Sequence, residues 1–208
     1  MDFRLKGEKI HAAGVKLAAI YLMDGKAAEA KKALDKAIKS FQAAPPEYQT
    51  DERKREISLL MSRTLADQGQ VNDAIAFLEE LPFHPDVNKM HADVAWRAQL
   101  WDDAAAGLKE VIADQNISLT RPFSPESAEL ILQRAIALNL AGDRVGLTNM
   151  REKYSDSMAA TKRAKVFEVV TRARQSSALA DRETLMSVVN EVDIFSDFLD
   201  AYKATQTQ

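Results

Sequence analysis

Cysteine is absent from this chain of 208 residues. Its absence excludes a disulfide scaffold, a thiolate metal site and a cysteine nucleophile. Glycine and proline are scarce, with 7 and 6 residues, too few for the dense turns of a β-sandwich or β-barrel. The chain also lacks a basic excess, because 28 Lys and Arg stand against 31 Asp and Glu, whereas nucleic-acid-binding proteins are usually basic. The 46% of hydrophobic residues predicts a packed core.

Long apolar runs are missing as well. The longest spans residues 17–23, whereas a membrane helix needs about 18 apolar residues or more. The first nine residues are charged throughout and lack the apolar stretch of a secretory signal peptide. We therefore expect no membrane insertion by this chain, no nucleic-acid partner and a cytoplasmic location.

Apolar residues recur at spacings of three and four along most of the sequence, which is the pattern of amphipathic helices. Short polar breaks such as Asp24-Gly25 separate neighbouring helices, so consecutive helices form antiparallel pairs. We expect N-caps at Asp86 and at Ser124, where Pro125 follows as the first helical residue. The predicted helices cover residues 10–23, 27–43, 51–67, 72–81, 87–98, 102–114, 125–141, 147–154, 161–175, 182–190 and a last segment from Asp193.

The helical pairs share landmarks at fixed distances from their breaks. The breaks are Gly25, Gly69 and Gly142, with Gln99 in the equivalent place of the third pair. A small residue precedes each break by two turns, an alanine follows three of the four, and a leucine lies one turn beyond that alanine. These landmark residues are Ala18, Ser62, Ala92 and Ala135, then Ala30, Ala74 and Ala104, then Leu34, Leu78 and Leu108. Small residues at such positions let paired helices approach closely.

These residues resemble the tetratricopeptide repeat (TPR), whose unit of about 34 residues carries small, aromatic, glycine and alanine landmarks. The first pair matches best, with Leu17, Ala18, Tyr21, Gly25, Ala30, Leu34 and Ala37. The resemblance covers residues 10–155, and the segment 193–202 resembles the closing segment of large bacterial tetratricopeptide proteins. It implies an all-α, right-handed α-α superhelix of about ten helices. We therefore expect one solenoid domain over residues 1–208, with degenerate pairs in 10–155 and C-terminal capping helices in 156–208.

The resemblance also implies where a partner binds, because the first helix of each pair lines the concave wall in this family. Arg63, Arg97 and Lys89 would favour an acidic ligand there, with Trp96 as an anchor. The apolar wall of the first pair would be covered by a partner, by upstream helices or by the chain's own apolar tail. The predicted groove residues are Val15, Ala19, Leu22, Leu59, Arg63, Lys89, Asp93, Trp96, Arg97 and Asn139.

No pattern in the sequence identifies a reaction. The three histidines, His11, His84 and His91, form no zinc motif, and nucleotide-binding and serine-hydrolase motifs are missing. We therefore expect no catalytic, cofactor or metal site, and predict a non-catalytic scaffold that binds a protein or peptide. One alternative is a structural module that stacks on further repeats or self-associates. Another is a regulator or enzyme with a small-molecule pocket.

Overall fold

The computed structural model describes residues 2–119, 122–172 and Leu199. Within these ranges the regular structure is helical, with nine helices and no strand, which confirms the all-α class there. The predicted helix at 182–190 lies outside the described residues, as does the last predicted segment except for Leu199. The helices are α1 (Asp2–Met23), α2 (Ala27–Gln42), α3 (Asp51–Asp67), α4 (Val71–Glu79), α5 (Pro85–Arg97), α6 (Trp101–Asp114), α7 (Pro125–Ala141), α8 (Arg144–Ala159) and α9 (Ala164–Thr171).

The chain divides into two compact units. Unit 1 comprises Met1–Ala98 together with Ile194–Gln208, so it contains α1 to α5 and Leu199. Unit 2 comprises Gln99–Asp193 and contains α6 to α9. Unit 1 is thus built from two stretches of sequence that unit 2 separates. The prediction of one domain over the whole chain stays a prediction.

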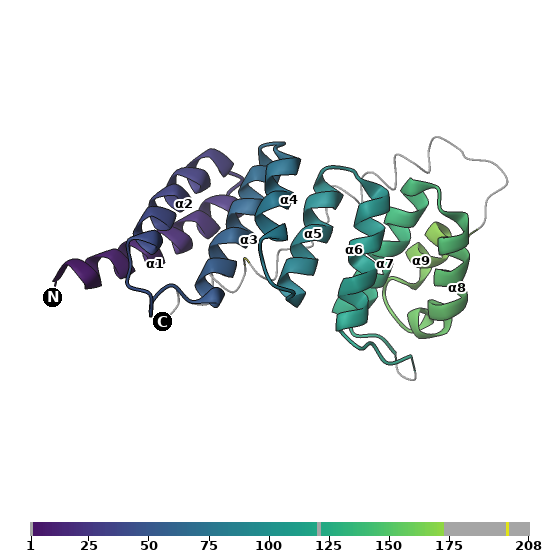
Figure 1. The fold of residues 1–208 in the computed structure, drawn as a ribbon. Coiled ribbons are helices and arrows are strands. Elements are labelled where there is room, and N and C mark those ends of the chain that lie inside the picture. The colour runs from purple at the N-terminus through teal and green to yellow at the C-terminus, as the bar shows by residue number, and fades with distance from the viewer. Residues whose placement is uncertain (1, 120–121, 173–198, 200–208) are drawn as a thin grey trace. The chain divides into compact units, whose positions relative to one another are not determined.

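Within unit 1 the helices pack as neighbouring pairs (Figure 1). Helix α1 packs along α2, and α3 packs along α4. The first helices form a continuous row, because α3 contacts α1 on one side and α5 on the other. Helix α2 also contacts α3, and α4 contacts α5. In unit 2, α7 packs against α6, α8 and α9.

All four predicted breaks adopt a left-handed backbone conformation. The φ angles are +69° at Gly25, +76° at Gly69 and +78° at Gly142. Gln99 has a φ of +57°, although this conformation costs a residue with a side chain roughly 1–2 kcal/mol. The predicted break at Gln99 therefore has the same left-handed backbone as the other three breaks. It lacks the glycine that would adopt this conformation at little energetic cost.

The small landmark residues lie inside the packed units. Ala18, Ser62, Ala92 and Ala135 are all fully buried, and so are the alanines that follow three of the breaks. In the second pair the two landmarks are bonded to each other, since the Ser62 hydroxyl donates to the Ala74 carbonyl at 2.9 Å. This bond joins α3 to α4 and satisfies a polar group that the core would otherwise isolate.

The helix starts confirm one predicted cap and correct the other. Ser124 caps α7, because its hydroxyl oxygen accepts the Ser127 N–H at 3.2 Å. The predicted cap at Asp86 is wrong. Pro85 occupies the first turn of α5, so the cap falls on His84, whose Nδ1 accepts the Asp86 N–H at 3.2 Å. Helix α9 begins at Ala164 instead of residue 161, since a turn occupies residues 160–163.

Gly14 marks the closest approach between α1 and α2. A Cβ atom on Gly14 would lie 3.0 Å from the Cβ of Ala37 and 3.1 Å from the Ala33 carbonyl oxygen. A side chain at position 14 would therefore press on Ala37 and on the Ala33 carbonyl of α2.

We predict that Gly14→Val lowers the free energy of unfolding by about 1–3 kcal/mol, because its methyl groups push α1 away from α2. Gly7, on the same helix, is the matched control, since a Cβ there would meet nothing within 4 Å. Gly7→Ala should raise stability by about 0.5–1 kcal/mol through the backbone entropy of the unfolded chain. Urea unfolding followed by circular dichroism measures both, and equal stability of the two variants would contradict the close approach.

Candidate functional site

The four aliphatic residues of the predicted groove all lie inside unit 1. Val15, Ala19 and Leu22 on α1, and Leu59 on α3, are buried members of one hydrophobic cluster. Leu199 belongs to the same cluster. The prediction that these residues meet a partner stays a prediction, and in the structure they pack within the unit.

Helix α3 is buried on every side along most of its length. All ten residues from Ile57 to Ala66 are buried, and ten residues make nearly three turns. Leu59, Arg63 and Ala66 share one face of α3 by their spacing of four and three. That face is the one predicted to line the groove, and it is closed to solvent in this structure.

Four charged side chains form a closed ring between α3 and α5. Arg63 and Asp67 are one turn apart on α3, and Asp93 and Arg97 are one turn apart on α5. Arg63 Nη1 lies 3.1 Å from Asp93 Oδ2, and Arg97 Nη1 lies 2.9 Å from Asp67 Oδ1. Within each helix, Arg63 Nε is 3.3 Å from Asp67 Oδ1, and Arg97 Nε is 3.0 Å from Asp93 Oδ2. We call these residues the charge tetrad.

The charge tetrad runs from the core to the surface. The side chains of Arg63 and Asp93 are 4% and 1% exposed, whereas those of Asp67 and Arg97 are 19% and 27% exposed. Removing Arg63 and Asp93 from water is costly, and their mutual attraction and hydrogen bonds offset that cost. Both guanidinium groups are engaged by carboxylates of the fold. An acidic ligand at Arg97 would therefore have to compete with Asp67 and Asp93.

The remaining predicted groove residues have different positions. Trp96 is buried and Lys89 is half-buried, both on α5. Asn139 lies on α7 in unit 2, where its Nδ2 donates to the Val170 carbonyl at 2.8 Å. The structure thus brings Arg63, Asp93 and Arg97 together. It adds Asp67, which the sequence analysis missed although it lies one turn from Arg63.

A second buried polar cluster surrounds His11 on α1. The Tyr48 hydroxyl donates to the Glu8 carbonyl at 3.2 Å, so it accepts from His11 Nδ1, which is 3.0 Å away. His11 Nε2 is buried and has no hydrogen-bond partner among the described residues. The His11 ring packs on Phe41, and the Arg53 guanidinium lies 3.9 Å above the Tyr48 ring centre. Burial, aided by the charge of Arg53, lowers the pKa of His11 below its ordinary value.

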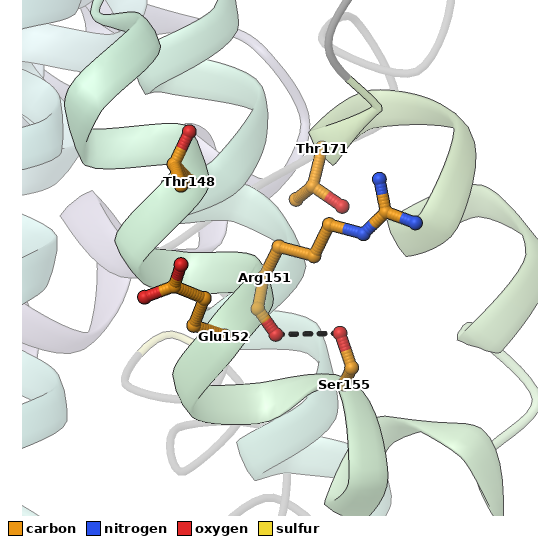
Figure 2. A pocket seen from close by; sticks show the side chains of 5 residues that line it. All are labelled: Thr148, Arg151, Glu152, Ser155 and Thr171. Carbon is orange, nitrogen blue, oxygen red and sulfur yellow. Dashed lines mark hydrogen bonds between the residues drawn. The ribbon is translucent and has the colours of Figure 1, made fainter.

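Unit 2 contains a surface depression of 430 Å³ between α8 and α9 (Figure 2). It is lined by Thr148, Arg151, Glu152 and Ser155 from α8 and by Thr171 from α9. The three hydroxyl groups donate to carbonyls one turn earlier on their own helices, so their protons are not offered to a ligand. Figure 2 shows Arg151 extending toward α9, whereas the side chain of Glu152, the other charged residue of the lining, points away from it. The lining of the depression therefore carries one cation and one carboxylate.

Two further features are absent from the described residues. In that part of the chain, no helix is both long enough and apolar enough to span a bilayer. The same residues contain no group of three His, Asp or Glu side chains placed to hold a metal ion. Comparison with protein families, with curated proteins and with solved structures gave no match for this chain.

We predict that Asp93→Ala lowers the free energy of unfolding by about 3–5 kcal/mol, because the buried Arg63 guanidinium loses its buried carboxylate partner and keeps only the partly exposed Asp67. The control is Glu168→Ala, which removes an ion pair with Arg172 whose two side chains are more than half exposed. Glu168→Ala should lower the free energy of unfolding by less than about 1 kcal/mol. Urea unfolding of both variants supplies the comparison. A loss for Asp93→Ala no larger than the control would show that the charge tetrad contributes little to stability.

We predict that stability falls as the pH drops from about 7.5 to about 5.5, around the ordinary histidine pKa of about 6.5. The pKa of His11 is lowered in the folded chain. In this pH range the unfolded chain therefore binds a proton at His11 more readily than the folded chain does. His11 therefore contributes its full stability above the unfolded pKa and loses it as the pH falls through that value. His91 acts in the same direction, because burial lowers its pKa too.

The measurement is the midpoint of urea unfolding across this pH range. His11→Gln and His91→Gln should each flatten the pH dependence, and the double variant should flatten it most. An unchanged slope in His11→Gln would show that the imidazole is protonated as easily in the folded chain as in the unfolded one.

Proposed function

We propose that this chain is a non-catalytic protein-interaction module, in which helical pairs of the tetratricopeptide type stack as a right-handed superhelix. Several observations support this proposal. The first helices α1, α3 and α5 form a row. All four breaks have the left-handed backbone that the landmark pattern requires, including the one at Gln99. The small landmark residues are fully buried. These features are those of stacked helical repeats that present one long face to a ligand.

The observation that most supports the proposal is the row formed by the first helices α1, α3 and α5. The partner that fits it is a helical or extended peptide segment with an apolar side chain and a carboxylate. The apolar side chain would be held among the core residues of α1 and α3, and the carboxylate would approach the exposed side of the charge tetrad. Arg97 and the half-buried Lys89 are the cations nearest solvent on α5. Asp67 and Asp93 already pair with Arg97, so a ligand must offer better geometry than they do, which favours selectivity.

A second candidate function is stacking on another copy or on further repeats, and the outer face of α1 favours it. Ile10 and Leu17 are seven residues apart on this helix, so they share a face, and they are 44% and 42% exposed. The end of a stack of helical pairs normally needs a polar outer face. Sedimentation velocity tests stacking on another copy: a dimer that Leu17→Lys converts to monomer supports it, and a monomeric wild-type chain excludes it.

We predict that a photo-crosslinking residue, p-benzoyl-L-phenylalanine, captures a protein when it replaces Lys89 but not when it replaces Lys153 on α8. The experiment is done in the native host, and crosslinked products are identified by mass spectrometry. Adding Arg97→Gln to the Lys89 variant should reduce the captured product about tenfold, because a charge-assisted hydrogen bond contributes roughly 1.5–3 kcal/mol. Circular dichroism must first show that the variant keeps its helical content. Capture from the Lys153 position alone would assign the partner to unit 2 and refute the proposed surface.

A further inference from the structure

The connection between α4 and α5, residues 80–84, turns a large aromatic side chain out to solvent. Phe83 is 78% exposed, more than any other large hydrophobic residue that the structure describes. The fold therefore gains little hydrophobic free energy from its ring. Single exposed apolar residues are common on protein surfaces. Phe83 differs from them in how the loop holds it and in which charges lie beside it.

The loop is anchored to unit 1 on both sides of Phe83. Leu81 packs against the hydrophobic cluster, and Val87 is a member of it. Pro82 and Pro85 flank Phe83 and fix two of the φ angles in this short stretch. A loop that is fixed in this way loses little conformational entropy when a partner covers it. Phe83 is thus held outward by a rigid support.

Two carboxylates beside Phe83 lie where the fold gains nothing from them. Glu79 is the last residue of α4 and Glu80 is its C-cap, and both are exposed. The C-terminus of a helix carries a partial negative charge, so carboxylates there are unfavourable. The last turn of α4 has no basic residue, and within the described residues neither carboxylate forms an ion pair with a lysine or an arginine.

The surrounding sequence has the same sign of charge. Residues 64–88, which include all of α4 and the loop, contain five Asp and Glu and no Lys or Arg. Surface loops often carry function, and features that break a local rule of stability are expected at functional sites. Here an exposed aromatic ring and two unfavourable carboxylates occur within five residues.

We propose that Phe83 is a docking knob, which inserts into an apolar pocket with a basic rim on another protein. The ring is the buried anchor of this contact, as aromatic residues commonly are at interfaces. Glu79 and Glu80 attract the lysines or arginines of the rim and orient the partner. Phe83 lies outside the row of first helices, so this contact does not rest on the proposed function.

Urea unfolding tests whether the fold needs these side chains. Phe83→Ala should leave the urea midpoint unchanged, and Glu79→Gln combined with Glu80→Gln should leave it unchanged or raise it. The matched control is Phe77→Ala on α4, whose half-buried ring packs against the cluster, and it should lower the midpoint. A lower midpoint in Phe83→Ala or in the double variant would give these residues a structural role and overturn the proposal.

Photo-crosslinking tests the contact itself. In the full chain, p-benzoyl-L-phenylalanine replaces Phe83 in the native host, and the control position is Val145 of unit 2, which is 72% exposed. A protein captured at position 83 and not at position 145 is identified by mass spectrometry and purified. Phe83→Ala should then weaken its binding on the order of 10- to 100-fold, because the buried ring is lost.

The purified partner also tests the charge of the rim. Glu79→Gln with Glu80→Gln should weaken binding at low salt and reduce its dependence on NaCl concentration, because the attraction of exposed charges is screened by salt. Asp102→Asn with Asp103→Asn removes the same charge from exposed positions at the start of α6. This control variant should bind the partner as the wild-type chain does.

Four results would overturn the proposal. The crosslinker at position 83 captures nothing, or only what position 145 captures. The partner surface at the crosslinked peptide is acidic or has no apolar pocket. The purified chain crosslinks to itself as its concentration rises, which would assign Phe83 to an interface between copies. Phe83→Ala binds the purified partner as tightly as the wild-type chain. A product at position 83 together with none at Lys89 would support the docking knob and refute only the first-helix surface.

Discussion

A pair of antiparallel helices has two apolar faces and can bury only one of them against itself, and the organisation of unit 1 follows from this constraint. Each pair must lie against the next, so α3 is enclosed by α1, α2, α4 and α5. The small residues at the landmark positions allow the helices to come close enough for this enclosure. Ala18 and Ser62 are fully buried, and at Gly14 even a methyl group would press on the backbone of α2.

The enclosure of α3 also determines the surroundings of Arg63. Arg63 lies among ten consecutive buried residues, so its guanidinium cannot reach solvent as a surface arginine does. Its carboxylate partner Asp93 comes from the next first helix, 30 residues later, and Asp67 meets Arg97 across the same distance. Equivalent positions in successive pairs thus carry opposite charges. The charge tetrad therefore pairs only when α3 and α5 are in one particular register.

Much of the helical framework could be predicted from the sequence because its signals are local. Apolar spacing located the helices, and the breaks followed from polar residues and glycines, with Gln99 identified only by comparing the pairs. The cap at His84 was missed because Asp86 is the better capping residue in isolation. The preference of Pro85 for the first helical position outweighs it.

The site was harder to predict than the framework, since it depends on contacts between distant residues. The predicted groove contained Arg63, Asp93 and Arg97 as separate cations and anions, and nothing local shows that they neutralise one another. Likewise, the periodicity of α3 does not reveal that its groove face is buried. That burial depends on the packing of the whole unit, to which Leu199 contributes from far along the sequence.

The position of Leu199 has a consequence for how the protein is made. A ribosome delivers the N-terminal helices first, and most domains complete their packing as soon as their own residues have emerged. Unit 1 cannot do so, because one of its core side chains is synthesised only after the whole of unit 2. Until then, the nascent helices of unit 1 lack one of the side chains that complete their apolar core.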